Sequence, residues 1–110
     1  MANTFKLKTK ASVGVTTVGI YTATTPVTAT VIIGITLANT SGSGINVGVG
    51  VTRSSSDNVN ILKNVPIPQG SSLEVMQGNK FVLEQNDTVT VKSDVSNSLD
   101  VSLTIMEITP

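Results

Sequence analysis

The stretch "GINVGVGVT", residues 44–52, alternates strictly between two kinds of residue. In an extended strand, successive side chains point to opposite faces of the sheet. One face would carry the apolar residues Ile45, Val47, Val49 and Val51. The other face would carry Asn46, Gly48, Gly50 and Thr52. The stretch therefore predicts a β-strand with one apolar, buried face and one face that is almost bare.

The bare face needs an explanation, because glycine inside a strand adds backbone entropy and has no side chain to pack. Two explanations fit the pattern. A β-bulge or a tight twist of the sheet at this point would require glycine. Alternatively, another chain or another sheet lies flat against the backbone, in which case Asn46, Gly48, Gly50 and Thr52 form a partner interface.

The composition of the whole chain favours the same class of structure. Valine and threonine, both β-branched, account for 32 of the 110 residues. Turn sequences recur every 8 to 12 residues, and no long segment has the apolar spacing of an amphipathic helix. The sequence predicts a single all-β domain over residues 1–110, with essentially no helix. We expect a compact antiparallel β-sandwich or a jelly-roll-like barrel of eight to nine short strands.

Several strands can be assigned a buried side from their alternation. The segment after Pro26 has these apolar residues in phase: Val27, Ala29, Val31, Ile33, Ile35 and Leu37. The last strand has Leu99, Val101, Leu103 and Ile105 in phase. A bulge is predicted near Gly19, and "QGN" at residues 77–79 predicts a tight hairpin turn.

Charge is distributed unevenly along a chain whose net charge is zero. Residues 1–56 carry +4 and residues 57–110 carry −4. This asymmetry suits copies that meet head to tail, or docking on a charged partner. It would equally average out if the two halves interleave in one sandwich.

The N-terminal segment "TFKLKTK", residues 4–10, alternates as well. Phe5 and Leu7 would lie on one face, with Lys6, Lys8 and Lys10 on the other. One interpretation is an edge strand whose lysines discourage stray pairing. The other is an N-terminal arm, residues 1–10, in which Phe5 anchors on a partner and the lysines pair with its carboxylates.

Catalytic, metal and cofactor chemistry finds little support in the sequence. The chain has no cysteine and no histidine, the commonest activating groups and transition-metal ligands. Glu84, Asp87, Asp94 and Asp100 stand at turns or strand ends, where acids usually cap backbone amides. Three aromatic residues leave few rings for stacking on sugars or bases, and basic clusters typical of nucleic-acid binding are missing. We expect no enzyme activity, no cofactor, no metal site, no nucleic-acid partner and no membrane association.

Several segments, taken in order, resemble a known family. They are "MANTF" (1–5), "YTA" (21–23), "TVIIGITLANTS" (30–41), "LKNVPIPQGSSLEVMQGNKFVLEQNDTVTVKS" (62–93) and "DVSLTIMEIT" (100–109). Together they resemble small structural proteins encoded by tailed bacteriophages, including phages of marine bacteria and cyanobacteria. The most specific part runs from Val65 to Lys92. The resemblance implies a virion component present in many copies.

These observations predict a non-enzymatic virion protein, with a capsid decoration or cement protein as the favoured role. Such a domain would stabilise a shell by bridging neighbouring subunits. A tail, neck or fibre-associated virion protein is the alternative, and a ligand-binding β module is a weaker third. The expected partners are the major capsid protein or another virion protein, and further copies of the chain as a closed homo-oligomer such as a trimer. The start "MANTFKLKTK" has no secretory apolar stretch, so we expect synthesis in the host bacterial cytoplasm and location in the virion.

Overall fold

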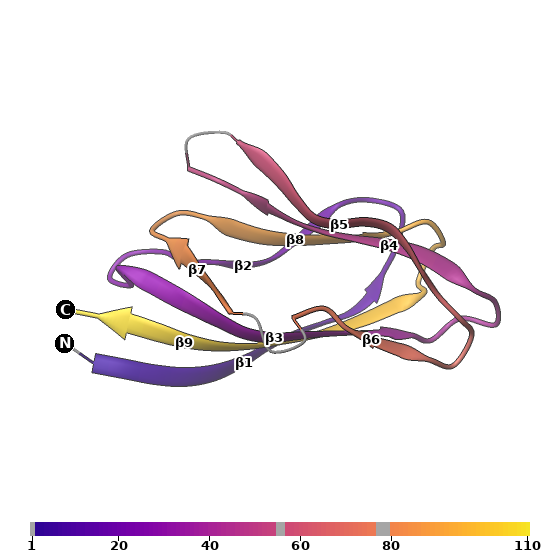
Figure 1. Ribbon diagram of the computed structural model, residues 1–110, viewed down its shortest axis with the longest axis horizontal. Coiled ribbons are helices and arrows are strands. Elements are labelled where there is room, and N and C mark those ends of the chain that lie inside the picture. The colour runs from indigo at the N-terminus through magenta and orange to yellow at the C-terminus, as the bar shows by residue number, and fades with distance from the viewer. Residues whose placement is uncertain (1, 55–56, 77–79) are drawn as a thin grey trace.

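The computed structural model describes residues 2–54, 57–76 and 80–110 (Figure 1). The turn predicted at residues 77–79 lies outside these ranges. Over the described residues the chain forms strands and no helix, so no helix there is long and apolar enough to cross a membrane.

The described residues form nine β-strands, which are arranged in two antiparallel sheets that face each other (Figure 1). The strands are β1 (Ala2–Val13), β2 (Val18–Thr22), β3 (Ala29–Asn39), β4 (Ile45–Thr52), β5 (Asn58–Ile67), β6 (Ser72–Glu74), β7 (Phe81–Glu84), β8 (Thr88–Ser93) and β9 (Leu99–Thr109). Sheet A has the order β1-β9-β3, and β6 and β7 share the far edge of β3. Sheet B has the order β2-β8-β4-β5. The predicted all-β sandwich is confirmed, although β1, β3 and β9, with 11 or 12 residues each, are longer than the short strands expected.

The core lies between the two sheets and is built from alternate residues of each strand. From β4, the side chains of Ile45, Val47, Val49 and Val51 are all buried, as the alternation predicted. From β9, Leu99, Val101, Leu103 and Ile105 are buried in the same way. Each fully buried aliphatic side chain contributes about 1.5–3 kcal/mol of hydrophobic stabilisation, so these two strands supply a large share of the core energy.

The predicted phase of β3 is wrong in its first half. Ile35 and Leu37 are buried, but upstream of them the buried residues are Thr30 and Ile32, and Val31 points to the outer face. The pairing of β3 with β9 shifts between Ile32 and Gly34. This irregularity inserts one residue into the strand, and one extra residue exchanges the two faces because the side-chain period of a strand is two.

The predicted irregularity near Gly19 is confirmed, because the pairing of β2 with β8 shifts between Gly19 and Tyr21. The shift leaves Tyr21 opposite Val89 and buried between the sheets. The N- and C-terminal strands β1 and β9 run side by side, so both ends of the chain lie at one end of the sandwich (Figure 1).

The phase change in β3 can be tested with a matched pair of variants. Ile32→Ala removes a side chain that is completely buried, and we expect it to lower the free energy of unfolding by about 2–5 kcal/mol. Ile33→Ala removes a side chain that is only partly buried, so we expect a clearly smaller loss. Chemical denaturation of both variants measures the difference. A larger loss for Ile33→Ala would restore the simple alternation and contradict the bulge.

Candidate functional site

Residues 2–13 form β1, the edge strand of sheet A, in continuous register with β9 from Ala2 to Lys10. Lys6, Lys8 and Lys10 lie opposite buried residues of β9, namely Ile105, Leu103 and Val101. Directly opposed residues share a face, so the three lysines are on the inner side of the sheet, at the open margin of the sandwich. Phe5 and Leu7 project from the outer side, and their side chains are 70% and 64% exposed.

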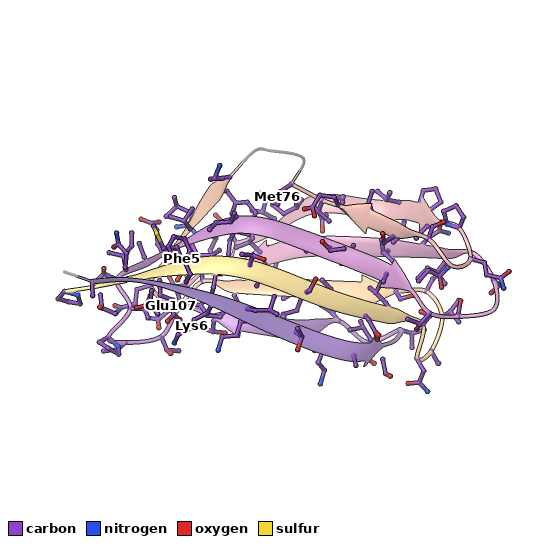
Figure 2. All side chains as sticks on the ribbon, turned by 90° about the horizontal axis from the view of Figure 1, so that it is seen from below. Phe5, Lys6, Met76 and Glu107 are labelled. Carbon is purple, nitrogen blue, oxygen red and sulfur yellow. The ribbon has the colours of Figure 1, made fainter. Side chains whose placement is uncertain are left out.

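On the lysine side of β1, an exposed lysine joins an ionic network with buried groups at the end of the sandwich (Figure 2). Nζ of Lys6 lies 2.7 Å from Oε1 of Glu107, a residue that is only 8% exposed. The hydroxyl of Tyr21 donates to Oε2 of Glu107 at 2.7 Å and shares a 2.8 Å hydrogen bond with the hydroxyl of Thr30. Both carboxylate oxygens of Glu107 are therefore satisfied from two strands, β1 and β2.

This network shifts the pKa values of two of its members. The hydrogen bond from Lys6, followed by that from Tyr21, holds the pKa of Glu107 below its ordinary value of 4.5, against the opposing effect of burial. Burial is the main cause that raises the pKa of Tyr21 to about 12, and the neighbouring Glu107 carboxylate adds to it. Glu107 is thus an anion and Tyr21 a neutral donor near neutral pH, which is the state the hydrogen bonds require.

A polar cleft of about 560 Å³ opens beside this network, between β1 and the segment around β2. Lys6, Lys8 and Glu107 line one wall, and Tyr21 and Pro26 belong to the other. Lys6 is engaged by Glu107, whereas Lys8 and Lys10 form no ion pair with any described residue. Of the two lysines that line the cleft, Lys8 is therefore the one whose charge is not engaged by an ion pair with a described residue. We call this cleft the edge cleft.

The bare face of β4 lies on the outer side of sheet B, where Gly48 and Gly50 line a groove of about 320 Å³. A Cβ atom placed on Gly50 would lie 2.9 Å from the carbonyl oxygen of Val59 in β5. The same atom on Gly48 would lie 3.5 Å from the carbonyl oxygen of Leu62, an ordinary contact. The pairing of β4 with β5 shifts twice between Val47 and Gly50, so it is the irregular backbone of β5 that approaches Gly50.

The two polar members of this face differ in their surroundings. The backbone N–H of Asn46 donates to Oδ1 of Asp94 at 2.9 Å, and its side-chain amide donates to Oδ2 at 3.3 Å. Thr52 is exposed next to Thr88 of β8. The four residues predicted as an interface thus share one surface, while Phe5 and the β1 lysines belong to sheet A.

The acids considered for catalysis mainly hold the backbone. Asp87 is 1% exposed and accepts hydrogen bonds from the backbone N–H groups of Ser54 and Glu84 at 3.1 and 2.9 Å. Nε of Arg53 lies 2.9 Å from Oδ2 of Asp87, and the same guanidinium binds Glu84. Burial would raise the pKa of Asp87, but the two N–H groups and the guanidinium outweigh it and lower the pKa. Such a carboxylate remains ionised and is unsuited to serve as a general acid.

Asp94 and Asp100 have the same role, accepting from the backbone N–H groups of Asn46 and Ser12. Within residues 2–54, 57–76 and 80–110, no three His, Cys, Asp or Glu side chains gather in a way that could hold a metal ion. The site residues present lysine side chains on β1 that can form ion pairs, and a face of β4 that carries little side-chain bulk.

The ion pairs also settle how the two oppositely charged halves of the chain are arranged. Lys6 and Arg53, from the basic half, pair with Glu107, Glu84 and Asp87, from the acidic half. Each sheet contains strands from both halves, so these charges meet inside one molecule.

Two features of the site were not predicted from the sequence. One is the contact between Tyr21 and Glu107, which are 86 positions apart, and the other is the position of Val31, partly buried, and Val82, exposed, on the outer face of sheet A. A glutamate in phase with the apolar residues of β9 was the available signal for the first. Nothing in the local sequence signals the position of Val31, because it depends on the bulge in β3.

The described residues thus form an antiparallel β-sandwich, with the lysines on the edge strand of sheet A and the glycine face on the outer side of sheet B. No protein-family model matches the chain, and no curated protein matches it in sequence. Among solved structures, it is similar to a protein of the Bacillus endospore appendages, described as disulfide-linked pili, with 15% identity and a TM-score of 0.60 over 99% of this chain and 88% of that one.

It is also similar to a protein in the acid-stable capsid structure of Helicobacter pylori bacteriophage KHP30. There the identity is 10% and the TM-score 0.55, over 98% of this chain and 89% of the other. A weaker likeness, with 13% identity and a TM-score of 0.47, covers 94% of this chain and 32% of a chain of infectious bursal disease virus, Gx strain. The first two likenesses show that this chain has, over its whole length, a fold found in a pilus and in a phage capsid.

The role of Gly50 can be separated from that of Gly48 by adding a single methyl group to each. We expect Gly50→Ala to destabilise the fold by about 1–3 kcal/mol, because the new Cβ would clash with the carbonyl of Val59. Gly48→Ala meets an ordinary contact and should change stability little, so it is the matched control. Thermal and chemical unfolding of the two variants measures both effects. Equal stability of the two variants would show that the backbone of β5 does not require glycine at position 50.

The Glu107 network predicts a pH dependence of stability. Because the folded pKa of Glu107 is lowered, the stability it contributes is present above its ordinary pKa of 4.5 and is lost as the pH falls through the folded value. Glu107→Gln should therefore reduce stability at pH 7 and flatten its fall below pH 4.5. Asp57→Asn, which removes an exposed acid, should keep the slope of the unaltered protein. Denaturation midpoints measured from neutral to acidic pH would contradict this if the Glu107→Gln and wild-type curves run parallel.

Proposed function

We propose that this protein is a non-enzymatic structural protein of a bacteriophage virion, and specifically a capsid decoration or cement protein. The observation that carries the proposal is the whole-length likeness of its fold to proteins that build a pilus and a phage capsid. Several sequence segments, above all residues 65–92, resemble structural proteins of tailed phages in the same order along the chain, and this resemblance supports the same role.

In this role the protein binds only the assembled shell and bridges neighbouring subunits. A ligand that binds the assembled state and not the free parts stabilises the assembly by mass action. The rigid sandwich, with hydrogen-bonded acids at its turns, suits a component that holds its shape while bridging a joint. A tail, neck or fibre location would use the same surfaces in a ring or sleeve, and the test below distinguishes it.

The edge cleft is the contact that we assign to the major capsid protein or another virion protein. Lys8 and Lys10 on the inner side of β1 would meet an acidic segment of the neighbouring subunit, while Lys6 stays paired with Glu107. Exposed ion pairs contribute only about 0.2–1 kcal/mol each, so the lysines orient the partner and many copies add up. Phe5 projects from the opposite side of β1 and therefore belongs to a different surface.

The glycine face of β4 is the second contact in the proposal. Asn46, Gly48, Gly50 and Thr52 present little side-chain bulk on the outer side of sheet B, which allows a partner's backbone to approach closely. Two contact surfaces on different parts of one small domain are what a protein that links two subunits requires.

The proposal is tested by returning the purified protein to virions stripped of it. We expect cryo-electron microscopy to show the sandwich at joints of the capsid, with a copy number comparable to that of the capsid protein, and the refilled particles to resist heating better. Lys8→Glu should weaken rebinding and make it more sensitive to salt, because it reverses a charge at the edge cleft. Lys10→Glu should act in the same direction, because Lys10 lies on the same side of β1, next to the cleft. Lys80→Glu, which reverses an exposed charge away from β1, is the matched control.

The possible outcomes separate the alternatives. Density at the tail, neck or fibres would replace the cement role with the alternative location. Absence of the protein from virions would reject the structural role altogether. Normal rebinding of both β1 variants would leave the location intact and reject the edge cleft as the contact.

A further inference from the structure

The outer face of sheet A carries an apolar row that crosses four strands. Phe5 of β1 lies opposite Met106 of β9, Met106 opposite Val31 of β3, and Val31 opposite Val82 of β7. Opposed residues share a face and are in side-chain contact range, so these four form one continuous row. Phe5 is 70% and Val82 57% exposed at its ends, and the two central residues are partly buried.

The rows on either side widen this surface without adding free charge. On one side, Leu7 (64% exposed) is followed by Thr104 and Gly34. On the other, the row runs Asn3, Ile108, Ala29 and Glu84. Glu84 is the one charged residue in the three rows, all of whose residues are described, and it is ion-paired with Arg53.

The outer face of sheet B shows that this is not a general property of the molecule. The corresponding row across β2, β8, β4 and β5 consists of Thr22, Thr88, Thr52 and Asn58. Polar residues are the usual covering of a solvent-facing side of an antiparallel sheet, and sheet B follows that rule. Sheet A departs from it, and a contiguous exposed apolar patch marks an interaction surface.

We propose that the apolar row is the contact through which two copies of this chain associate, sheet A against sheet A, about a twofold axis. A twofold contact places the same patch on both subunits, so the patch must be complementary to itself. An uncharged apolar centre meets that condition, because two identical patches can then face each other without bringing like charges together. A partner recognised by charge would instead be matched by unpaired charged groups, and the three rows offer none.

The size of the face agrees with a specific dimer. The molecule measures 45 × 26 × 21 Å, so a broad face is large enough for the roughly 800 Å² per partner that a stable complex of standard size buries. Two stacked sheets also pack about 10 Å apart with interdigitating side chains, which buries Phe5 and Leu7. The contact closes on itself, which leaves the edge cleft and the glycine face free, and the inference does not depend on the proposed function.

The test measures the oligomeric state of the full chain by analytical ultracentrifugation from about 1 to about 200 μM. We expect a concentration-dependent dimer. The double variant Phe5→Thr and Val82→Thr places threonine, which favours strands, at both positions and should raise the dissociation constant at least about 100-fold. Val59→Thr with Ile61→Thr, at exposed apolar positions of β5 in sheet B, is the matched control and should dimerise normally. If the double variant loses its β-sheet circular dichroism, Leu7→Thr alone replaces it.

Cross-linking identifies the contacting face directly, because the chain contains no cysteine. Thr104→Cys, beside the apolar row, should give covalent dimers with a flexible bismaleimide, whereas Thr90→Cys on the outer face of sheet B should not.

A wild-type chain that stays monomeric over the whole range overturns the proposal. So does a dimer that the double variant leaves intact, since it must then use another surface. A monomer whose double variant loses binding to stripped virions would assign the row to a shell protein and also reject the second copy. Dimerisation without any virion binding would uphold this inference while rejecting the proposed function.

Discussion

The structure depends on one constraint: two sheets must direct their β-branched and aliphatic side chains into a single layer between them. β4 and β9 meet it by strict alternation, with every second residue buried over most of their length. β3 meets it only by a bulge between Ile32 and Gly34, which brings Ile32, Ile35 and Leu37 to the same side. Because a strand has a period of two, the bulge that fills the core also turns Val31 outward. The core and the apolar row on the outside therefore have a common cause.

The margin of the sandwich is governed by a second requirement, the satisfaction of buried charge. Glu107 continues the inward-facing series of β9, where an unpaired carboxylate would be costly. Lys6 and Tyr21 supply the compensating charge and hydrogen bond from two different strands. The inward lysines also suit β1 as an edge strand, since inward-pointing charges discourage pairing with other chains. The edge that is protected in this way is the one that we assign to the virion contact.

The molecule thus presents three surfaces of different chemistry. The edge cleft is cationic, the glycine face is polar and low in bulk, and the outer face of sheet A is apolar. The groups that resemble catalytic residues, among them Asp87, are instead bound to backbone amides, where they stiffen turns. The same fold occurs in proteins of a pilus and of a phage capsid.

The sequence by itself determined the fold class, the buried faces of β4 and β9, the irregularity at Gly19 and the separation of Phe5 from Lys6 along β1. All of these follow from local alternation, which is a property of neighbouring residues. Only the tertiary structure decided the phase of β3, the pairing of Tyr21 with Glu107, and the approach of the Val59 carbonyl to Gly50. It also placed Phe5, Met106, Val31 and Val82 in one row. Those features depend on the register between strands that are distant in sequence, and register is fixed by the packing of the whole core and by bulges that local alternation does not reveal.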